Sequence, residues 1–288
     1  MGKSGQDFWK MIPNLHSQIS LRTAKMPAAP PKAIVFLANN GQDPTEAAIP
    51  WEILTSAGCI VTFATEHGEV ASADPVLLQS GVFASLLGPS KQATDSYKAM
   101  VASPEYQQPR AWSDKDFDIL EYEIAILPGG HDKPIRQYLE CQSLHEHLGR
   151  FLPHTARTCR QRPKVLGAIC HGVLALAFAK CPVNPERSLL AEHGLQTTTL
   201  PKWMEGTAWV ASQAWLKGSY YRTYIERGGW CCGDVEEAGG SYIRGPMSTK
   251  PFVHTDPNHR YISARFPGDA ELWTKTILSE AKEAFGVW

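Results

Sequence analysis

Residues 165–172 read Val-Leu-Gly-Ala-Ile-Cys-His-Gly, and this stretch decides the fold that the sequence predicts. Its first five residues are apolar without interruption, which is typical of a strand buried on both faces of a parallel sheet. Residues 173–180 are mostly apolar and favour a helix, so only Cys170, His171 and Gly172 separate the two elements. A strand that turns sharply into a helix is the context of a nucleophile elbow, here with cysteine in place of serine.

Other strand-like and helix-like segments alternate on both sides of this unit. The predicted strands are 33–38, 59–65, 124–127 and 261–265, and the predicted helices are 45–57, 134–152 and 271–284. Strands that alternate with helices predict an α/β fold, with a doubly wound, mostly parallel sheet and helices on both faces. The first strand–helix–strand crossover should be right-handed.

We expect one α/β domain over residues 32–288, preceded by an N-terminal arm and proline-rich linker at 1–31. An insertion at about 66–113 is rich in Pro, Ser, Gln and Asp and has weak periodicity, which predicts a lid or loop at the ligand-binding edge of the sheet. A second insertion, at about 202–247, is unusually aromatic. Its notable side chains are Trp203, Trp209, Trp215, Tyr220, Tyr221, Arg222 and Tyr224.

Composition limits the partners and the compartment. The 288 residues hold 28 Lys and Arg against 29 Asp and Glu, and this charge balance argues against a nucleic-acid binder. Apolar runs are shorter than the roughly 20 residues that cross a bilayer, and no signal-like segment opens the chain, so we expect a cytoplasmic protein with no membrane partner.

Seven scattered cysteines fit a reducing compartment. The adjacent Cys231 and Cys232 lack the spacer that is usual in zinc sites, so no metal is expected.

The predicted elbow carries the candidate chemistry. At the end of a central strand, the Cys170 thiol should enter the crevice, and the helix N-terminus behind it should favour thiolate and lower the thiol pKa. His171 could act as general base and offer its backbone N–H to an oxyanion, with Gly129 and Gly130 on the neighbouring strand supplying a second donor. The alternatives are a buried, inert thiol and an ordinary histidine.

Three motifs together resemble the ThiJ/PfpI superfamily, which has a class I glutamine-amidotransferase-like fold. They are Glu-Ala-Ala-Ile-Pro at 46–50, Leu-Pro-Gly-Gly-His-Asp at 127–132 and Ala-Ile-Cys-His-Gly at 168–172, and the resemblance covers roughly 33–284. It implies a flavodoxin-like α/β fold with cap insertions, nearest the glyoxalase-like and chaperone-like branch. The residues that it implies are Cys170, His171, Glu205 and Glu46 for catalysis, and Gly129, Gly130 and His131 for the oxyanion or substrate.

The two acidic residues have separate roles in this resemblance. Glu205 is placed by ungapped alignment through 196–199 and would orient the imidazole of His171. Glu46 would share a hydrogen bond with the sulfur of Cys170 and should be protonated to do so. The alternatives are a solvated surface carboxylate for Glu205 and an acid favoured by the helix dipole for Glu46. Residues 263–268 depart from the Gly-x-Asn-Pro turn of many relatives, so the pocket wall should differ there.

The resemblance implies a cysteine enzyme for small carbonyl compounds, such as a glutathione-independent glyoxalase that converts a 2-oxoaldehyde to a 2-hydroxy acid. No cofactor is implied, and relatives commonly form homodimers. One alternative is a hydrolase or hydratase of amidase, peptidase or isonitrile-hydratase type that acts on an amide or related substrate. Another is a non-enzymatic stress or redox-sensing protein in which Cys170 is oxidised reversibly. The aromatic insertion is either a cap that packs on the sheet or the lining of a pocket for a substrate larger than a two- or three-carbon aldehyde.

Overall fold

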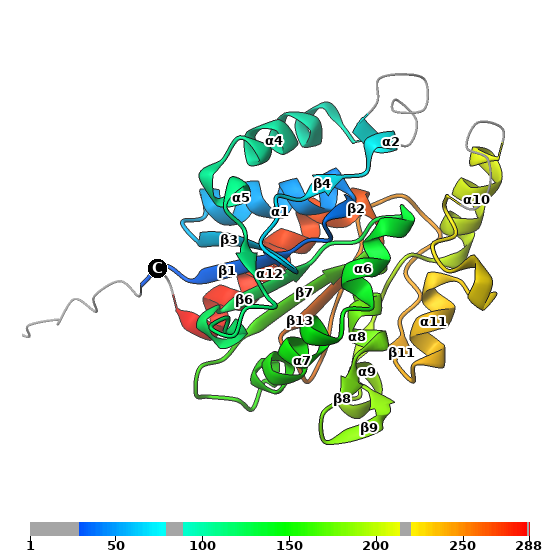
Figure 1. Ribbon diagram of the computed structural model, residues 1–288. Coiled ribbons are helices and arrows are strands. Elements are labelled where there is room, and N and C mark those ends of the chain that lie inside the picture. The colour runs from blue at the N-terminus through cyan, green and yellow to red at the C-terminus, as the bar shows by residue number, and fades with distance from the viewer. Residues whose placement is uncertain (1–28, 79–88, 214–219, 287) are drawn as a thin grey trace, which may run out of the picture.

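The computed structural model describes residues 29–78, 89–213, 220–286 and 288. Most of the arm expected at 1–31 therefore lies outside the described residues, as does Trp215 of the aromatic insertion. Figure 1 shows a central sheet with helices packed around it. Within the described ranges, no helix combines the length and apolar character that a membrane crossing requires.

The main sheet has seven strands in the order β12-β13-β7-β6-β1-β3-β5. They are β1 (Lys32–Phe36), β3 (Ile60–Thr65), β5 (Arg110–Ala111), β6 (Ile124–Leu127), β7 (Val165–Ile169), β12 (Val253–Thr255) and β13 (Tyr261–Ala264). All neighbouring strands are parallel except β12, which runs antiparallel to β13 at the edge. This arrangement confirms the predicted doubly wound α/β fold.

Helices cover both faces of the sheet (Figure 1). Helices α1 (Pro44–Ser56) and α12 (Ala270–Phe285) pack together on one face, with α4 (Lys91–Val101) against α1. Helices α6 (Arg136–Leu139), α7 (Gln142–Phe151) and α8 (Leu174–Phe178) lie on the other face. The other α-helices of the described residues are α2 (Pro75–Leu78), α5 (Pro104–Gln107), α9 (Leu189–Glu192), α10 (Lys202–Ser212) and α11 (Cys231–Glu237).

In the described residues, three two-stranded sheets accompany the main sheet. They pair β2 (Asn40–Gln42) with β4 (Ser72–Ala73), β8 (Lys180–Cys181) with β9 (Asn184–Ser188), and β10 (Gln196–Thr197) with β11 (Ser241–Tyr242).

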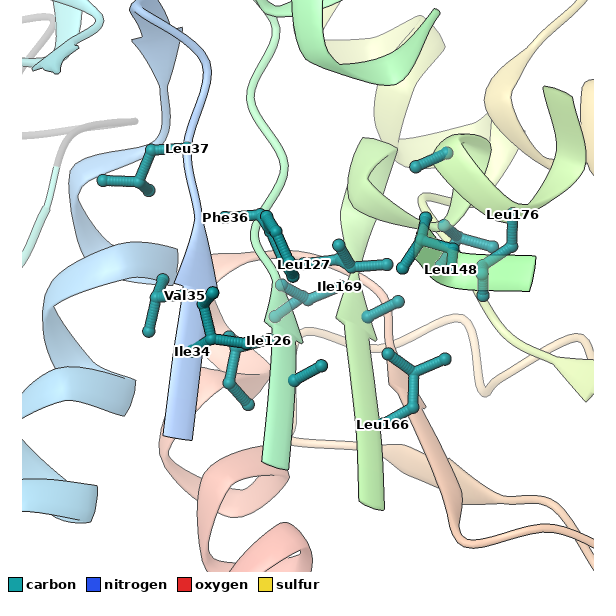
Figure 2. Packing of buried hydrophobic residues seen from close by; sticks show 14 of the residues in the cluster. Ile34, Val35, Phe36, Leu37, Ile126, Leu127, Leu148, Leu166, Ile169 and Leu176 are labelled. Atoms are coloured by element: carbon teal, nitrogen blue, oxygen red, sulfur yellow. The ribbon is translucent and has the colours of Figure 1, made fainter. Parts of the chain in front are cut away.

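The core follows the three central strands. Ile34, Ile126, Leu166 and Ile169 are fully buried, and Figure 2 shows these side chains projecting from β1, β6 and β7 into the layers between sheet and helices. Because such strands are covered on both faces, their sequences are continuously apolar instead of alternating.

Two segments differ from the sequence prediction. The insertion at about 66–113 is expected as a lid or loop, yet it contains α4 and supplies β5, the edge strand of the main sheet. Helix α4 buries only Ala93, Ser96 and Met100, so its sequence carries little apolar signal. The helix expected at 134–152 is divided into α6 and α7 by residues 140–141.

Candidate active site

The turn after β7 has the geometry of a nucleophile elbow. Cys170 has φ = 55°, the left-handed region that side-chain-bearing residues rarely occupy. A hydrogen bond stabilises this backbone conformation, because Oγ1 of Thr199 donates to the backbone oxygen of Cys170 at 2.7 Å. A Cβ placed on Gly172 would lie 2.2 Å from the backbone oxygen of Leu127, so only glycine fits where the turn passes β6.

The start of α1 carries the carboxyl group of Glu46 into the site. Asp43 caps this helix by accepting hydrogen bonds from the N–H groups of Thr45 at 2.8 Å and Glu46 at 3.1 Å. Glu46 is fully buried, and its Oε2 accepts a hydrogen bond from the Gly129 N–H at 2.7 Å. The sequence-based placement of Glu46 beside the elbow thus agrees with the structure.

Burial controls the protonation of Glu46. Desolvation raises the pKa of this carboxyl well above 4.5, the negative charge of Asp43 raises it further, and the interactions with Gly129 and Cys170 lower it by less. These effects together favour the neutral acid. Its Oε1 has no hydrogen-bond partner among the described residues, so this oxygen is available to carry the proton.

Cys170 and His171 form the centre of the site. The Sγ of Cys170 lies 3.6 Å from Nδ1 of His171, and each residue is only 1% exposed. Burial raises the pKa of the Cys170 thiol well above its usual 9, and the neighbouring Glu46 raises it further. Burial also lowers the pKa of His171 well below 6.5, with His131 adding to the shift. The resting site holds a thiol and a neutral imidazole.

The expectation of a low thiol pKa is therefore wrong. It depended on the N-terminus of the helix that follows the elbow, yet α8 has only five residues. The desolvation of a fully buried thiolate, which raises this pKa, outweighs the hydrogen bond from the His171 N–H, which lowers it.

Glu205 is close to the site but has a different partner from the one expected. It lies on α10 and is 2% exposed, which also contradicts the alternative of a solvated surface carboxylate. Its Oε2 accepts a hydrogen bond from the Cys231 N–H at 3.0 Å, and within the described part of the chain no hydrogen bond joins it to His171. The structure thus does not show it orienting the imidazole. Burial raises the pKa of Glu205 to about 7.

The glycine pair after β6 approaches the elbow closely. A Cβ on Gly129 would lie 2.7 Å from the backbone nitrogen of His171, and one on Gly130 would lie 2.3 Å from the backbone oxygen of Gly41. The Gly129 N–H is already bonded to Glu46, so it is not free for an oxyanion as expected. The N–H groups of Gly130 and His171 are the remaining candidates.

A cavity of about 450 Å³ lies beside these residues. Asp43, His131 and Glu205 line it, and Leu77, Trp203 and Met204 are among its apolar walls. The ring of His131 stands 5.1 Å from that of His171 and edge-on to it, so this residue connects the cavity wall with the pair of Cys170 and His171. Cys170 is not among the lining residues.

His131 presents an unused nitrogen at this position. Its Nδ1 is buried and has no hydrogen-bond partner in the described ranges, and burial lowers the pKa of the ring to about 4. The neutral ring also packs edge-on against Tyr221, at a centroid distance of 4.6 Å. Two elements of the aromatic insertion, α10 and the segment with Tyr221, thus form part of the cavity wall.

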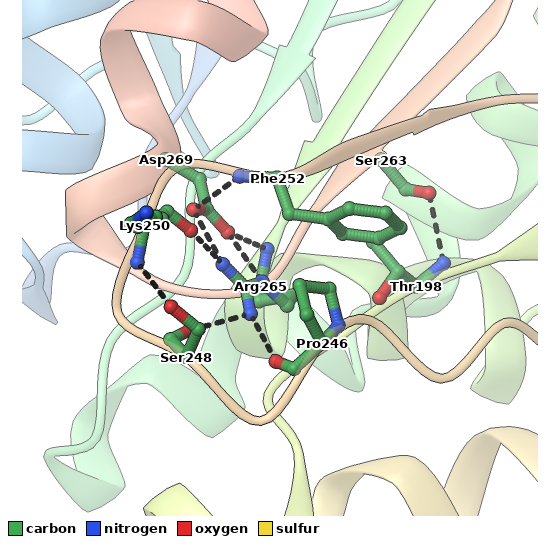
Figure 3. Close-up of polar contacts among 8 residues, drawn as sticks. All are labelled: Thr198, Pro246, Ser248, Lys250, Phe252, Ser263, Arg265 and Asp269. Carbon is green, nitrogen blue, oxygen red and sulfur yellow. Dashed lines mark hydrogen bonds and ion pairs between the residues drawn. The ribbon is translucent and has the colours of Figure 1, made fainter.

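The segment that departs from the relatives' turn forms another wall. Residues 266–268 line the cavity, and Figure 3 shows the ion pair that holds them. Arg265 and Asp269 are fully buried, with Nε of Arg265 donating to Oδ2 at 2.9 Å. The same guanidinium donates to the backbone oxygens of Pro246 and Ser248, at 2.9 and 3.0 Å, which ties the neighbouring loop to the wall.

The sequence patterns assigned no role in this site to Asp43, Thr199 or Cys231. Asp43 had a readable signal, because an Asp before Pro-Thr at a helix start is a typical N-cap. Thr199 links two thiol-bearing residues: it bonds the Cys170 carbonyl, and its Oγ1 lies 3.0 Å from Sγ of Cys231. Cys231 itself is buried, and the described residues contain no His, Cys, Asp and Glu cluster that could hold a metal ion.

Comparisons with known proteins agree with this arrangement. A family model described as ThiJ/PfpI family-like matches residues 37–261. An uncharacterized protein of Schizosaccharomyces pombe is 30% identical over 246 residues, which cover 85% of this chain and 82% of that protein. A second uncharacterized protein of the same yeast is 25% identical over 273 residues, covering 88% of this chain and 79% of its own.

Solved structures share the fold at low identity. The crystal structure of glyoxalase III from Candida albicans superposes with a TM-score of 0.62 at 18% identity, covering 88% of this chain and 97% of that one. The Rapid Encystment Protein of Francisella tularensis superposes with a TM-score of 0.60 at 16% identity, covering 87% and 99%. These two structures show that the chain shares the fold of glyoxalase III and of the encystment protein. With a family model matching most of its length and an elbow, a glycine pair and a buried glutamate in the family's order, the chain belongs to the ThiJ/PfpI family.

Proposed function

We propose that this protein is a cysteine-dependent enzyme that converts a 2-oxoaldehyde to a 2-hydroxy acid without glutathione. The observation that carries the proposal is the contact of the Cys170 thiol with both His171 and the protonated Glu46, next to a cavity. The similarity to glyoxalase III in fold supports it. In the proposal Cys170, His171 and Glu46 are catalytic, and Gly130 and His131 contact the substrate.

The first step adds the thiol to the aldehyde. Because Cys170 is protonated at rest, His171 must take its proton as the sulfur–carbon bond forms. The aldehyde oxygen receives the electron pair of the carbonyl bond, with the N–H groups of Gly130 and His171 as donors, and then the proton. The product of this step is a hemithioacetal. The aldehyde has to pass the ring of His131 to reach the sulfur, since His131 lines the cavity and Cys170 does not.

The second step moves a proton between adjacent carbons. His171 removes the proton from the former aldehyde carbon, which gives an enediolate, and delivers it to the neighbouring ketone carbon. The hydroxyl of the hemithioacetal loses its proton and the former ketone oxygen gains one, so the product is the thioester of the 2-hydroxy acid. A neutral imidazole is the form needed to accept a proton, and the lowered pKa of His171 provides it. Water then cleaves the thioester, releasing the 2-hydroxy acid and restoring the thiol. The overall change is addition of one water to the 2-oxoaldehyde.

The protonation state argues against a redox sensor. Reversible oxidation needs an exposed cysteine with a low pKa, whereas Cys170 is buried and its pKa is raised. A hydrolase that acts on amides would use the same thiol and the same oxyanion donors, so the product must separate the two enzyme classes.

An activity screen tests the proposal. Purified protein is incubated with 2-oxoaldehydes, amides and isonitriles, and 2-hydroxy acid, ammonia and formamide products are measured, with Cys170→Ala as the blank. We expect Cys170-dependent formation of a 2-hydroxy acid. Ammonia release from amides without turnover of any 2-oxoaldehyde would replace this proposal by the hydrolase alternative.

A further inference from the structure

We infer that the substrate carries an apolar group of about the size of a phenyl ring beside its dicarbonyl unit, and that helix α10 selects for it. The inference rests on the proposed function and names the substrate class within it. It follows from the size of the cavity, its mixed apolar and polar lining, and the residues that α10 contributes to that lining.

The cavity is too large for a three-carbon aldehyde. Its volume is about 450 Å³, roughly three times the volume of about 150 Å³ that accommodates benzene in an engineered cavity. A dicarbonyl with a single methyl group has five non-hydrogen atoms and would leave most wall atoms without a contact. A larger apolar substituent would fill this volume and gain the contacts.

The wall of the cavity combines apolar side chains with polar ones. The larger apolar residues are Leu77, Leu200, Trp203, Met204 and Phe266. The carboxyl groups of Asp43 and Glu205 and the imidazole of His131 also line it, and the ring of His131 stands edge-on to that of His171. A ligand with a polar dicarbonyl head and an apolar body matches this composition, with the head placed beside His131.

Helix α10 controls the apolar volume. Ala208 lines the cavity from this helix, about one turn after Glu205, and its small side chain leaves room that a larger one would fill. Val210 lies on the same helix but is 65% exposed and does not line the cavity. A tryptophan at either position adds the same side chain to α10. Only the one that replaces Ala208 should occupy the substrate volume, because Val210 does not line the cavity.

The test compares methylglyoxal with phenylglyoxal. We expect wild-type kcat/KM to be at least tenfold higher for phenylglyoxal. Ala208→Trp should lower kcat/KM for phenylglyoxal by at least tenfold while changing that for methylglyoxal less than threefold. Val210→Trp should leave both values unchanged. The two aldehydes differ in intrinsic reactivity. Comparing the ratio of their kcat/KM values between variants cancels that difference.

Binding provides a second measurement that needs no turnover. In Cys170→Ala protein, 1-phenylpropane-1,2-dione should bind at least tenfold more tightly than butane-2,3-dione, and Ala208→Trp in that background should remove the difference. Equal affinities, or Cys170-dependent turnover of methylglyoxal that equals or exceeds turnover of phenylglyoxal, would overturn the inference and leave the proposed function standing. Absence of turnover of every 2-oxoaldehyde would overturn the proposed function, and with it the inference.

Discussion

The carboxyl group of Glu46 is surrounded by groups that favour its neutral form. It is fully buried, faces the negative charge of Asp43, and interacts with the Gly129 N–H and the Cys170 thiol, whose effects on its pKa are smaller than that of burial. The sequence motif predicted the place of Glu46 and its protonation. It could not predict that the Cys170 thiol is also neutral, because that depends on how much solvent the surrounding chain removes.

Replacing Glu46 tests whether the site needs the proton of its neutral carboxyl group or the negative charge of its ionised form. In Glu46→Gln the amide can donate to the sulfur and accept from Gly129, so we expect kcat/KM to fall less than about tenfold. In Glu46→Ala the Gly129 N–H loses its acceptor, and the free energy of unfolding should fall by about 1–3 kcal/mol. Steady-state kinetics and urea unfolding measure the two effects. A fully inactive Gln variant would show that a carboxylate is required.

Replacing His171 tests whether the imidazole acts on the rate or on the thiol pKa. Since His171 is neutral at rest, removing its side chain removes no positive charge from beside the sulfur. We expect His171→Ala to lower kcat/KM by about 10²–10⁴ while the thiol pKa stays above its usual value. The pH dependence of iodoacetamide labelling, read on the peptide that contains Cys170, measures that pKa. An upward shift of several units would instead indicate an ion pair.

The elements nearest the site were the easiest to predict. Strands β6 and β7 begin and end where the apolar runs do, because a strand covered on both faces admits no polar residue. Helix α4 was missed, since it lies on α1 with only three buried residues, and its sequence resembles a polar loop. Glu205 was placed near the elbow, but its hydrogen bond to Cys231 depends on a contact 26 residues away that no local pattern records.

The junction of β6 with the elbow depends on glycine. In Gly172→Ala the added Cβ would lie 2.2 Å from a backbone oxygen. Both atoms are fixed by the backbone and cannot rotate away, so we expect the free energy of unfolding to fall by about 1–3 kcal/mol. Gly233 in α11 is the matched control, because a Cβ there has no atom within 4 Å. In Gly233→Ala the free energy of unfolding should rise by about 0.5–1 kcal/mol. Urea unfolding of both variants checks this, and equal effects would contradict the close approach.

Across the molecule, the strand order brings three distant segments together. The ends of β1, β6 and β7 are adjacent in the sheet, and so the chain near Glu46, Gly129 and Cys170 meets at one edge. The order of the motifs was enough to predict this meeting. The cavity wall was not predictable in detail, because it also needs α10 and residues 266–268 from outside those motifs.

Buried ionisable groups give the whole protein a pH dependence. The pKa of His131 falls from 6.5 to about 4 on burial, so its contribution to stability is complete above pH 6.5 and is lost as the pH falls toward 4. We expect His131→Gln to reduce the loss of unfolding free energy over this range by on the order of 3 kcal/mol. Urea unfolding at several pH values measures it. An unchanged slope would contradict the buried, neutral state.

Asp74 provides a comparison of opposite sign. Burial raises its pKa from 3.8 to about 6, so its contribution is complete below pH 3.8 and is lost as the pH rises through 6. Asp74→Asn should therefore reduce the stability lost between pH 4 and 6, whereas His131→Gln should reduce the stability lost on acidification.

The covalent role of Cys170 is open to direct measurement by rapid-quench mass spectrometry. Wild-type protein mixed with a 2-oxoaldehyde and quenched in acid within one turnover should carry one substrate mass on the peptide that contains Cys170, as the thioester. The Cys170→Ala protein should carry no such adduct and form no 2-hydroxy acid, while keeping its fold. Turnover with no adduct at Cys170, or full activity of Cys170→Ala, would contradict the assignment of this thiol as the nucleophile.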